Sequence, residues 1–362
     1  MERRWFIGLG PPIFALSAIA LATPVIATPL IGHGNHPDGE TVSRPALDRI
    51  PDVVSARAWL AQRGDGAWVY GRAGSTKRQA LPRAETAIAI GRRYVASTLP
   101  TSNGTSHVRL REWRTGSVAV DLDSSIWISA GAFSGDDLVV TGYGDARATS
   151  DGGLAVVRVG SGRFETVVPE RPFPQALGAS ASRGDVFVSA SGRRAASYLC
   201  AADLCDVQVI DVSSGRLVRS SRQTGFLRAI TDSAMILTDG EFKWISAREL
   251  ATGREIWRLR DSILMNPVAA AGGSVVGLVG SRPVGWAVAR IGATGRSADL
   301  TERVRDGHWP QVWAQLSTPD AVVIGRGDFA EALSGTGQST ADIIDVQAGS
   351  AIGRDLQLLP GE

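Results

Sequence analysis

Methionine, cysteine and histidine are all scarce in this sequence of 362 residues, with 3, 2 and 4 copies respectively. Few methionines together with 42 glycines and 10 tryptophans favour turn-rich β structure over helical bundles. The four histidines occur in no H-E-x-x-H motif, and the sequence contains no G-x-S-x-G. The motifs of common zinc peptidases and serine hydrolases are therefore missing.

Concentrated charge is also missing. Lys and Arg total 38 against 36 for Asp and Glu, a net charge of +2, and the paired arginines at 3–4, 92–93 and 193–194 are scattered along the chain. Phosphate binding needs a concentrated basic field, so we expect no nucleic acid partner. With 44% hydrophobic residues, the chain can fill the core of one large domain or of two ordinary ones.

The N-terminal region has no charged residue between Arg4 and Asp38. Two arginines, an apolar stretch and the small-residue pattern before position 28 predict a signal peptide over residues 1–27. The alternative is an uncleaved membrane anchor, because residues 5–31 could cross a bilayer, although three prolines interrupt them. No cysteine follows the apolar run, which argues against a lipoprotein.

Residues 28–50 are rich in Gly and Pro and are expected to form a flexible linker. Export would place the protein outside the cell or in the cell envelope, with membrane contact only through the N-terminal segment if it stays uncleaved. In that compartment Cys200 and Cys205 are expected to form a disulfide that pins a small loop excursion near residues 193–206. The alternative, a redox pair, lacks the usual two-residue spacing.

Seven glycines in hairpin-like settings recur at intervals of 38 to 54 residues: Gly74, Gly116, Gly162, Gly215, Gly253, Gly295 and Gly349. Four of them follow an acidic residue by four positions, namely Glu112, Asp211, Glu249 and Asp345. A carboxylate at that place can accept N–H groups of the turn, and glycine supplies the positive φ of a tight hairpin. The pattern predicts a repeated turn.

An apolar hairpin precedes each turn, as in residues 87–99 and 130–142. Four strands in each 40 to 50 residues are typical of one propeller blade. We therefore predict an all-β fold, a propeller of seven four-stranded antiparallel blades over residues 51–360. Because the first unit is short, its inner strand is either missing or supplied by the C-terminal end, and six blades plus an extra hairpin is the alternative. The two longest intervals are interpreted as loop insertions.

The stretch 247–257, ARELATGREIW, resembles the A-x-D-x-x-T-G-x-x-x-W repeat of the PQQ-like (quinoprotein-like) β-propeller superfamily. Glu249 stands where the family has Asp, and Thr252, Gly253 and Trp257 match. The resemblance implies that Trp257 packs between neighbouring blades; the other units lose this Trp, so a WD40-like propeller describes them nearly as well. The calcium ligands and Trp floor of quinone-dependent dehydrogenases are not recognisable, so we expect no cofactor and no metal.

Large apolar residues recur in the loops that lead into the first strand of each predicted blade. Such loops could form a ring that grips a peptide or a small ligand, or they could be core between blades. The residues are Trp127, Phe173, Phe226, Met265, Trp309 and Trp313. With no catalytic residues assigned, we expect a non-catalytic, extracytoplasmic scaffold for an unknown protein or peptide partner. The alternative is an enzyme, either a quinone-type oxidoreductase or a hydrolase, that uses the central cleft, where His308 is a candidate acid or base.

Overall fold

The computed structural model describes residues 53–54, 58–62, 66–72, 78–144, 152–165, 168–169, 182–201, 204–239, 243–281, 285–300, 312–314, 316–317, 321–326, 339–345 and 350–358. The predicted signal peptide (1–27) and linker (28–50) lie outside these segments. Within them, no helix has the length and apolar character needed to span a bilayer.

Strands dominate the described segments, with one short 3-10 turn, η1 (Ala271–Gly273). They form seven sheets. The first three contain β1 (Val53–Val54), β2 (Ala58–Gln62), β3 (Trp68–Arg72) and β4 (Arg78–Ala80); β5 (Thr86–Ile90), β6 (Tyr94–Pro100), β7 (Ser106–Glu112) and β8 (Val118–Asp123); and β9 (Trp127–Ser134), β10 (Asp137–Tyr143), β11 (Gly153–Arg158), β12 (Arg163–Phe164) and β13 (Val168–Pro169).

The next two sheets contain β14 (Ser182–Arg183), β15 (Phe187–Val188), β16 (Arg194–Ala201), β17 (Leu204–Asp211) and β18 (Arg216–Thr224); and β19 (Phe226–Ile230), β20 (Ala234–Thr238), β21 (Trp244–Glu249) and β22 (Glu255–Arg260). The last two contain β23 (Ser262–Ala270), β24 (Ser274–Ser281), β25 (Gly285–Ile291) and β26 (Ser297–Asp299); and β27 (Val312–Ala314), β29 (Ala321–Arg326), β30 (Ser339–Asp345) and β31 (Ser350–Leu358).

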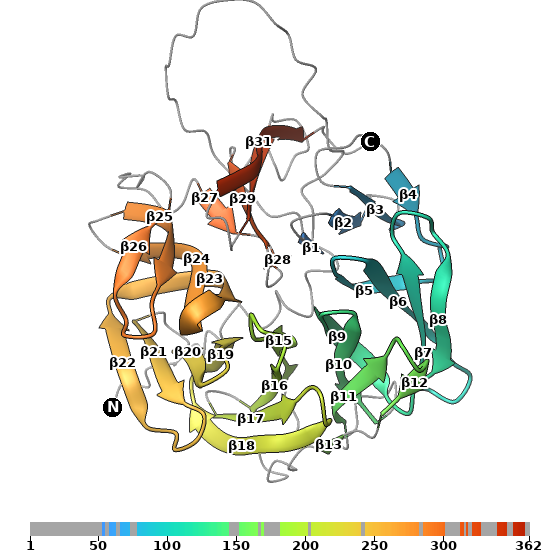
Figure 1. Cartoon of the computed structure of the whole chain (residues 1–362), viewed down its shortest axis with the longest axis horizontal. Helices are drawn as coiled ribbons and strands as arrows, with labels where there is room; N and C mark the ends of the chain where they lie inside the picture. The colour runs from blue at the N-terminus through green and yellow to red at the C-terminus, as the bar shows by residue number, and fades with distance from the viewer. Residues whose placement is uncertain are drawn as a thin grey trace, which may run out of the picture.

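The sheets stand around a common centre, with β5, β9, β15, β19 and β23 toward it and β8, β18, β22 and β26 on the rim (Figure 1). Strand β28 (Leu316–Ser317) comes from the C-terminal region but pairs in parallel with β1, where Val53 lies opposite Leu316. The inner edge of the first sheet is thus supplied by the C-terminal region, one of the two possibilities raised by its short sequence unit.

Core side chains fill the spaces between neighbouring sheets. Along β10, Leu138 and Val140 pack toward the sheet of β5 to β8, while Val139 packs toward the sheet of β14 to β18. A strand inside its sheet therefore contributes to two cores, which explains continuous buried runs such as Ala234–Thr238 of β20.

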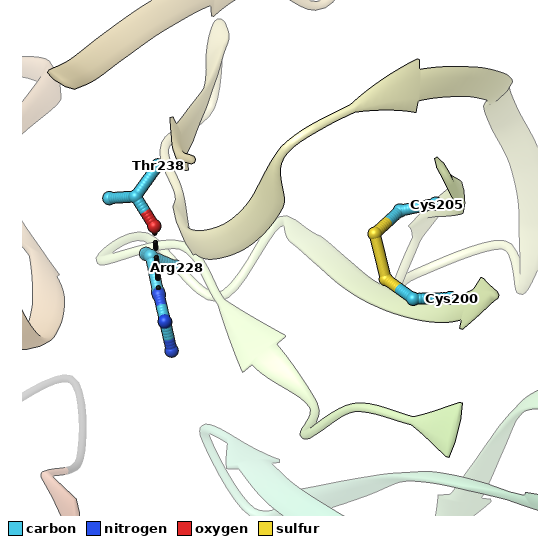
Figure 2. The surroundings of a disulfide bond; sticks show 4 residues. All are labelled: Cys200, Cys205, Arg228 and Thr238. Carbon is cyan, nitrogen blue, oxygen red and sulfur yellow. Dashed lines mark hydrogen bonds between the residues drawn. A yellow bond between two sulfur atoms is a disulfide. The ribbon is translucent and has the colours of Figure 1, made fainter. Parts of the chain in front are cut away.

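The two cysteines correct the interpretation of residues 193–206 as a loop excursion. Strands β16 and β17 form one regular antiparallel pair in which Cys200 lies directly opposite Cys205, with a Cα–Cα distance of 4.0 Å and a disulfide between them (Figure 2). Both cysteines are buried in the core shared with β19 and β20. The cysteines thus pack as ordinary core residues in a regular strand pair.

The repeated turn has the geometry that its glycines require. Positive φ angles occur at all five of the predicted turn glycines within the described segments: Gly116 (75°), Gly162 (59°), Gly215 (64°), Gly253 (77°) and Gly295 (82°). The role expected for the acid holds only in part. Asp211 accepts the N–H of Ser214 at 3.1 Å, whereas Glu249 accepts the hydroxyl of Thr252 at 2.5 Å.

A β-bulge follows several of these turns, three residues after the glycine. The ladder skips Ala119, Val218 and Ile256 in β8, β18 and β22. The next residue then faces the neighbouring sheet: Arg219 donates to the carbonyls of Leu250 (2.7 Å) and Ala251 (3.1 Å). Bulges redirect side chains in this way.

Two other side chains make the equivalent contact, each with the two backbone carbonyls that lie three and two residues before the turn glycine of the neighbouring sheet. Gln79 donates to the carbonyls of Trp113 (3.1 Å) and Arg114 (3.3 Å), and Arg158 donates to those of Val212 (2.5 Å) and Ser213 (2.9 Å). The repeated turn therefore joins neighbouring sheets. We call the side chain that contacts the turn of the next sheet a latch. Trp257 makes the apolar version of the latch: it is half-buried and lies against Gly295, where an added Cβ would come within 2.9 Å of its ring.

Candidate functional site

A cavity of about 280 Å³ lies among the innermost strands of five neighbouring sheets. Its wall comes from β5, β9, β15, β19 and β23 and from the turns that follow the first three of these strands. The lining residues are 88–92, 130–135, 185–192, 229–230 and 267–269. Five sheets that converge on one centre therefore build a single concave site.

Small side chains make room for this cavity, because the innermost strands approach one another closely. A Cβ on Gly91 would lie 2.7 Å from the ring of Phe133, and one on Gly131 would lie 3.3 Å from side-chain atoms of both Ile88 and Leu138. Ala130, Ala132 and Ala190 add further short walls. The cavity thus depends on runs of Gly, Ala and Ser in the first strand of each sheet and in the turn after it.

Polar groups line the turns at one end of the cavity and are held by neighbouring sheets. Ser134 donates to the carbonyl of Gly192 at 2.5 Å, and Ser191 donates to Asp232 at 2.6 Å. Two charged residues, Arg92 and Asp185, also belong to the lining. The wall is therefore mainly apolar with a few fixed polar groups, which is the usual character of a ligand site.

The aromatic ring predicted from the sequence lies elsewhere. None of the predicted residues in the described segments is among the cavity lining, which comes from the later part of β5, β9, β19 and β23. Trp127 is the first residue of β9 and is half-buried; Met265 lies in β23 and Trp313 in β27. Phe173 and Trp309 lie outside the described residues, as does His308.

Phe226 corrects the binding interpretation most directly. Its side chain is 2% exposed and packs with the disulfide in the core between the sheets of β14 to β18 and β19 to β22. It has no free face for a ligand, so the alternative of a core residue holds at this position. The physical reason is that Phe226 lies between two neighbouring sheets that cover its ring.

Arg228 is not among the residues that the sequence singled out. It lies in β19 between Leu227 and Ala229, which are both buried, yet it is itself partly exposed. Its Nε donates to the hydroxyl of buried Thr238 at 3.1 Å (Figure 2). Burial raises the pKa of Tyr198 to about 12, with the charge of Arg228 acting against this shift and that of Asp185 adding to it. Both charges therefore lie close to Tyr198.

A second charged cluster lies away from the cavity, on the sheet of β5 to β8. The buried carboxylate of Glu85 accepts hydrogen bonds from Ser97 (2.6 Å), Arg109 (2.9 Å) and Arg111 (2.7 Å). Burial by itself would raise the pKa of Glu85, but these hydrogen bonds outweigh it and lower the pKa. The cluster ties β6 and β7 to the residue that precedes β5 and has the character of a structural ion network.

His107 is the one histidine in the described segments. Its Nδ1 lies 2.7 Å from Asp123, and its Nε2 contacts Asp121. The hydrogen bond to Asp123 raises the pKa of His107 most, burial opposes this, and Asp121 adds to it. Because both ring nitrogens are occupied, His107 is poorly placed for acid–base work. Across the described segments, no three His, Cys, Asp or Glu side chains form a group that could hold a metal ion.

No protein-family model matches this sequence, and no curated protein matches it significantly. Solved structures do match by fold. A prolyl endopeptidase is 13% identical with a TM-score of 0.55, and the match covers 96% of this chain and 51% of that one. Prolyl oligopeptidase B from Galerina marginata is 10% identical with a TM-score of 0.51, covering 84% of this chain and 51% of that one. The β-propeller domain of the trilobed protease from Pyrococcus furiosus is 10% identical, with a TM-score of 0.48 and coverage of 86% and 98%.

The fold is a β-propeller. At these identities the likeness concerns the fold alone, and the chain spans about half the length of both peptidases. The matches nevertheless overturn the expectation of a non-catalytic scaffold and of a protein without an enzymatic role, because the fold neighbours are mainly peptidases.

Proposed function

We propose that this chain is the substrate-binding propeller of a peptidase or a related hydrolase, and that a short peptide segment enters its axial cavity. The observation that carries the proposal is the cavity of about 280 Å³ with a wall of small residues from five blades. Its volume lies near the lower end of the range for ligand pockets and suits a few residues of extended peptide. The peptidase fold neighbours supply the reaction class.

The cavity wall offers suitable chemistry for a peptide backbone. Strands β5, β9, β19 and β23 are the inner edge strands of their sheets. An edge strand has N–H and C=O groups that its own sheet does not use, and an extended peptide can pair with them. Short walls such as Ala132 and Ala190 leave room for the side chains of the peptide.

Blocking the cavity tests this function. Ala190→Trp places a large ring in the cavity wall, and Ala251→Trp makes the same change on an exposed outer turn. Fluorescence anisotropy with fluorescein-labelled, proline-containing tetrapeptides should show binding to the wild type and to Ala251→Trp, and at least a tenfold loss for Ala190→Trp. The same peptides are assayed for cleavage with the complete native protein. Equal binding by both variants, or no peptide binding at all, contradicts the proposal.

We also propose that the seven sheets are seven blades of a closed ring. Support comes from the seven sheets of the described residues and from the pairing of β1 with β28, because β28 lies in the chain between β27 and β29 of the last sheet. The turn of Glu249, Thr252 and Gly253 followed by Trp257 favours descent from a PQQ-like repeat over a WD40-like one.

Residues 1–27 are proposed as an export signal, or as an anchor if uncleaved, followed by a linker to residue 50. The protein would then work outside the cytoplasm on peptides, and not on nucleic acid. N-terminal sequencing of the protein from separated membrane and soluble fractions tests this. A mature chain that begins near residue 28 supports a cleaved signal, and one that begins at Met1 in the membrane fraction supports the anchor. A chain that begins at Met1 in the soluble fraction contradicts both.

A further inference from the structure

Two phenylalanines belong to the described wall of the axial cavity, and they differ in exposure. Phe133, in β9, is 7% exposed; its ring stacks against Tyr94 and covers Gly91, where an added Cβ would lie 2.7 Å from it. Phe187, in β15, is half-buried, and β15 lies toward the common centre of the sheets (Figure 1). The surface that Phe187 keeps exposed therefore lies on the cavity side, where a ligand can contact it.

The ring of Phe187 is held from behind by a buried aromatic residue. It stacks against the ring of Tyr198, with the two centroids 6.2 Å apart and the two planes 15° from parallel. Tyr198 is 3% exposed and lies over Gly184, where an added Cβ would clash with its ring. A phenylalanine ring that is already fixed loses little freedom when a ligand packs against it. Its apolar surface is therefore preorganised for binding.

The polar side chains of the wall are engaged within the protein. The hydroxyls of Ser134 and Ser191 donate to a backbone carbonyl and to a carboxylate of the chain itself. The two charged residues of the wall, Arg92 and Asp185, also have partners of their own. A polar or charged side chain of a ligand would thus exchange water for few new hydrogen bonds, which makes its burial costly. The wall favours a neutral apolar group.

We propose that Phe187 forms an apolar subsite of the axial cavity, and that this subsite selects peptides that carry a hydrophobic side chain such as that of leucine. The inference rests on the proposed function, because it names the class of peptide that the cavity takes. An aliphatic side chain that covers the ring removes apolar surface of both groups from water, which favours binding. The short side chains of Ala132 and Ala190 in the same wall leave space for it.

Peptides with side chains of nearly equal size test the apolar character of the subsite. Fluorescein-labelled alanine tetrapeptide amides carry Leu, Asn or Lys at each of the four positions in turn, and fluorescence anisotropy gives their affinities. At one position the wild type should bind the Leu peptide roughly tenfold more tightly than the Asn peptide, the effect of burying most of a leucine side chain. The Lys peptide should bind no better than the Asn peptide. Equal affinities for Leu and Asn at every position, or tightest binding of a Lys peptide, overturn the subsite.

Variants assign the preference to Phe187. Phe187→Ala should remove the preference for Leu over Asn while changing the affinity for the Asn peptide less than twofold. Phe187→Leu keeps some apolar surface and should retain only part of the preference. Phe164→Ala makes the same change at a half-buried phenylalanine of β12, the outermost strand of its sheet, and should leave the preference intact.

The two substitutions at Phe187 also guard against a folding defect. A preference that survives in folded Phe187→Ala overturns the role of this residue. If Phe187→Ala does not fold, Phe187→Leu decides the question, because an undiminished preference in that variant has the same meaning.

A second probe keeps the inference independent of peptide binding. N-acetyl-leucinamide and N-acetyl-asparaginamide are titrated against the wild type and Phe187→Leu, with the melting temperature as the readout. The leucine compound should raise the melting temperature of the wild type more than that of Phe187→Leu, and the asparagine compound should raise neither. Peptide binding without a preference for Leu overturns the subsite and leaves the proposed function intact. Absence of peptide binding overturns the proposed function, and absence of the N-acetyl-leucinamide effect as well overturns the subsite.

Discussion

Arg219 and Trp257 occupy the same place in two neighbouring blades, yet they join their blades to the next one by different means. Each comes four residues after a turn glycine and directly after a bulge. Arg219 lies over Gly253 and donates to two backbone carbonyls of that turn. Trp257 lies over Gly295 and packs its ring against the core between its blade and the next.

The comparison shows that the repeat requires a glycine in the turn but tolerates different side chains packed against it. Both receiving turns need a glycine because of their positive φ, 77° at Gly253 and 82° at Gly295. At Gly295 a Cβ would also come within 2.9 Å of the Trp257 ring. The residue that fills the space can be polar or aromatic. A propeller can therefore keep its ring geometry while the identity of the latch residue changes from blade to blade.

Removal of the aromatic latch should have the largest effect on stability. Trp257→Ala leaves a cavity between two blades and should lower the free energy of unfolding by about 2–3 kcal/mol, less than for a fully buried Trp because the side chain is half-buried. Urea denaturation measures the change. Ile256→Ala, on the adjacent residue that is 45% exposed, is the control and should cost less than about 0.5 kcal/mol. Similar losses for the two variants would show that Trp257 is no latch.

The polar latch should be weaker. Arg219→Met keeps most of the side-chain volume but removes the hydrogen bonds to Leu250 and Ala251, and since water can reach this seam, the loss should be about 1 kcal/mol. The same urea experiment on Arg260→Met, an exposed arginine of β22, controls for the loss of charge. A cost equal to that of Trp257→Ala would contradict the proposed ranking of the two latches.

The smallest effect should come from the turn acid and should depend on pH. The hydroxyl of Ser213 contributes most to lowering the pKa of Asp211 to about 2; partial burial opposes it, and Ser214 and Arg194 assist it. A depressed pKa stabilises the fold above the ordinary value of about 3.9, and this stabilisation is lost as the pH falls through about 2. The wild type should therefore exceed Asp211→Asn in stability at pH 6, and the difference should shrink between pH 4 and 2. A difference that is constant over this range would contradict the assignment.

Turn geometry was predictable because it is local. Gly116, Gly215 and Gly253 have a positive φ that other residues adopt only with strain, so the glycines themselves predict the turns. The latch was only partly predictable. Trp257 was recognisable through its resemblance to a family repeat, whereas Arg219, at the same place, looked like any surface arginine until the bulge placed it against the next blade.

The axial cavity was not predicted from the sequence, because the prediction relied on large aromatic residues. The informative pattern was the opposite one, namely runs such as 130–132, Ala-Gly-Ala, in the strands that converge on the axis. The cysteines are a similar case. Their spacing predicted the disulfide, but only the register of β16 and β17 showed that it lies in the core.

The pairing of β1 with β28 has a consequence for the order of folding. It joins Val53 to Leu316, so nearly the whole described chain must be synthesised before the partner of β1 exists. Contacts so distant in sequence form late, and we expect the seam between them to close after the other blades have assembled. Until then the inner edge of the first blade is open to other chains. The two-residue length of β1 keeps that edge too short to nucleate aggregation while the newly made chain waits for its C-terminal region.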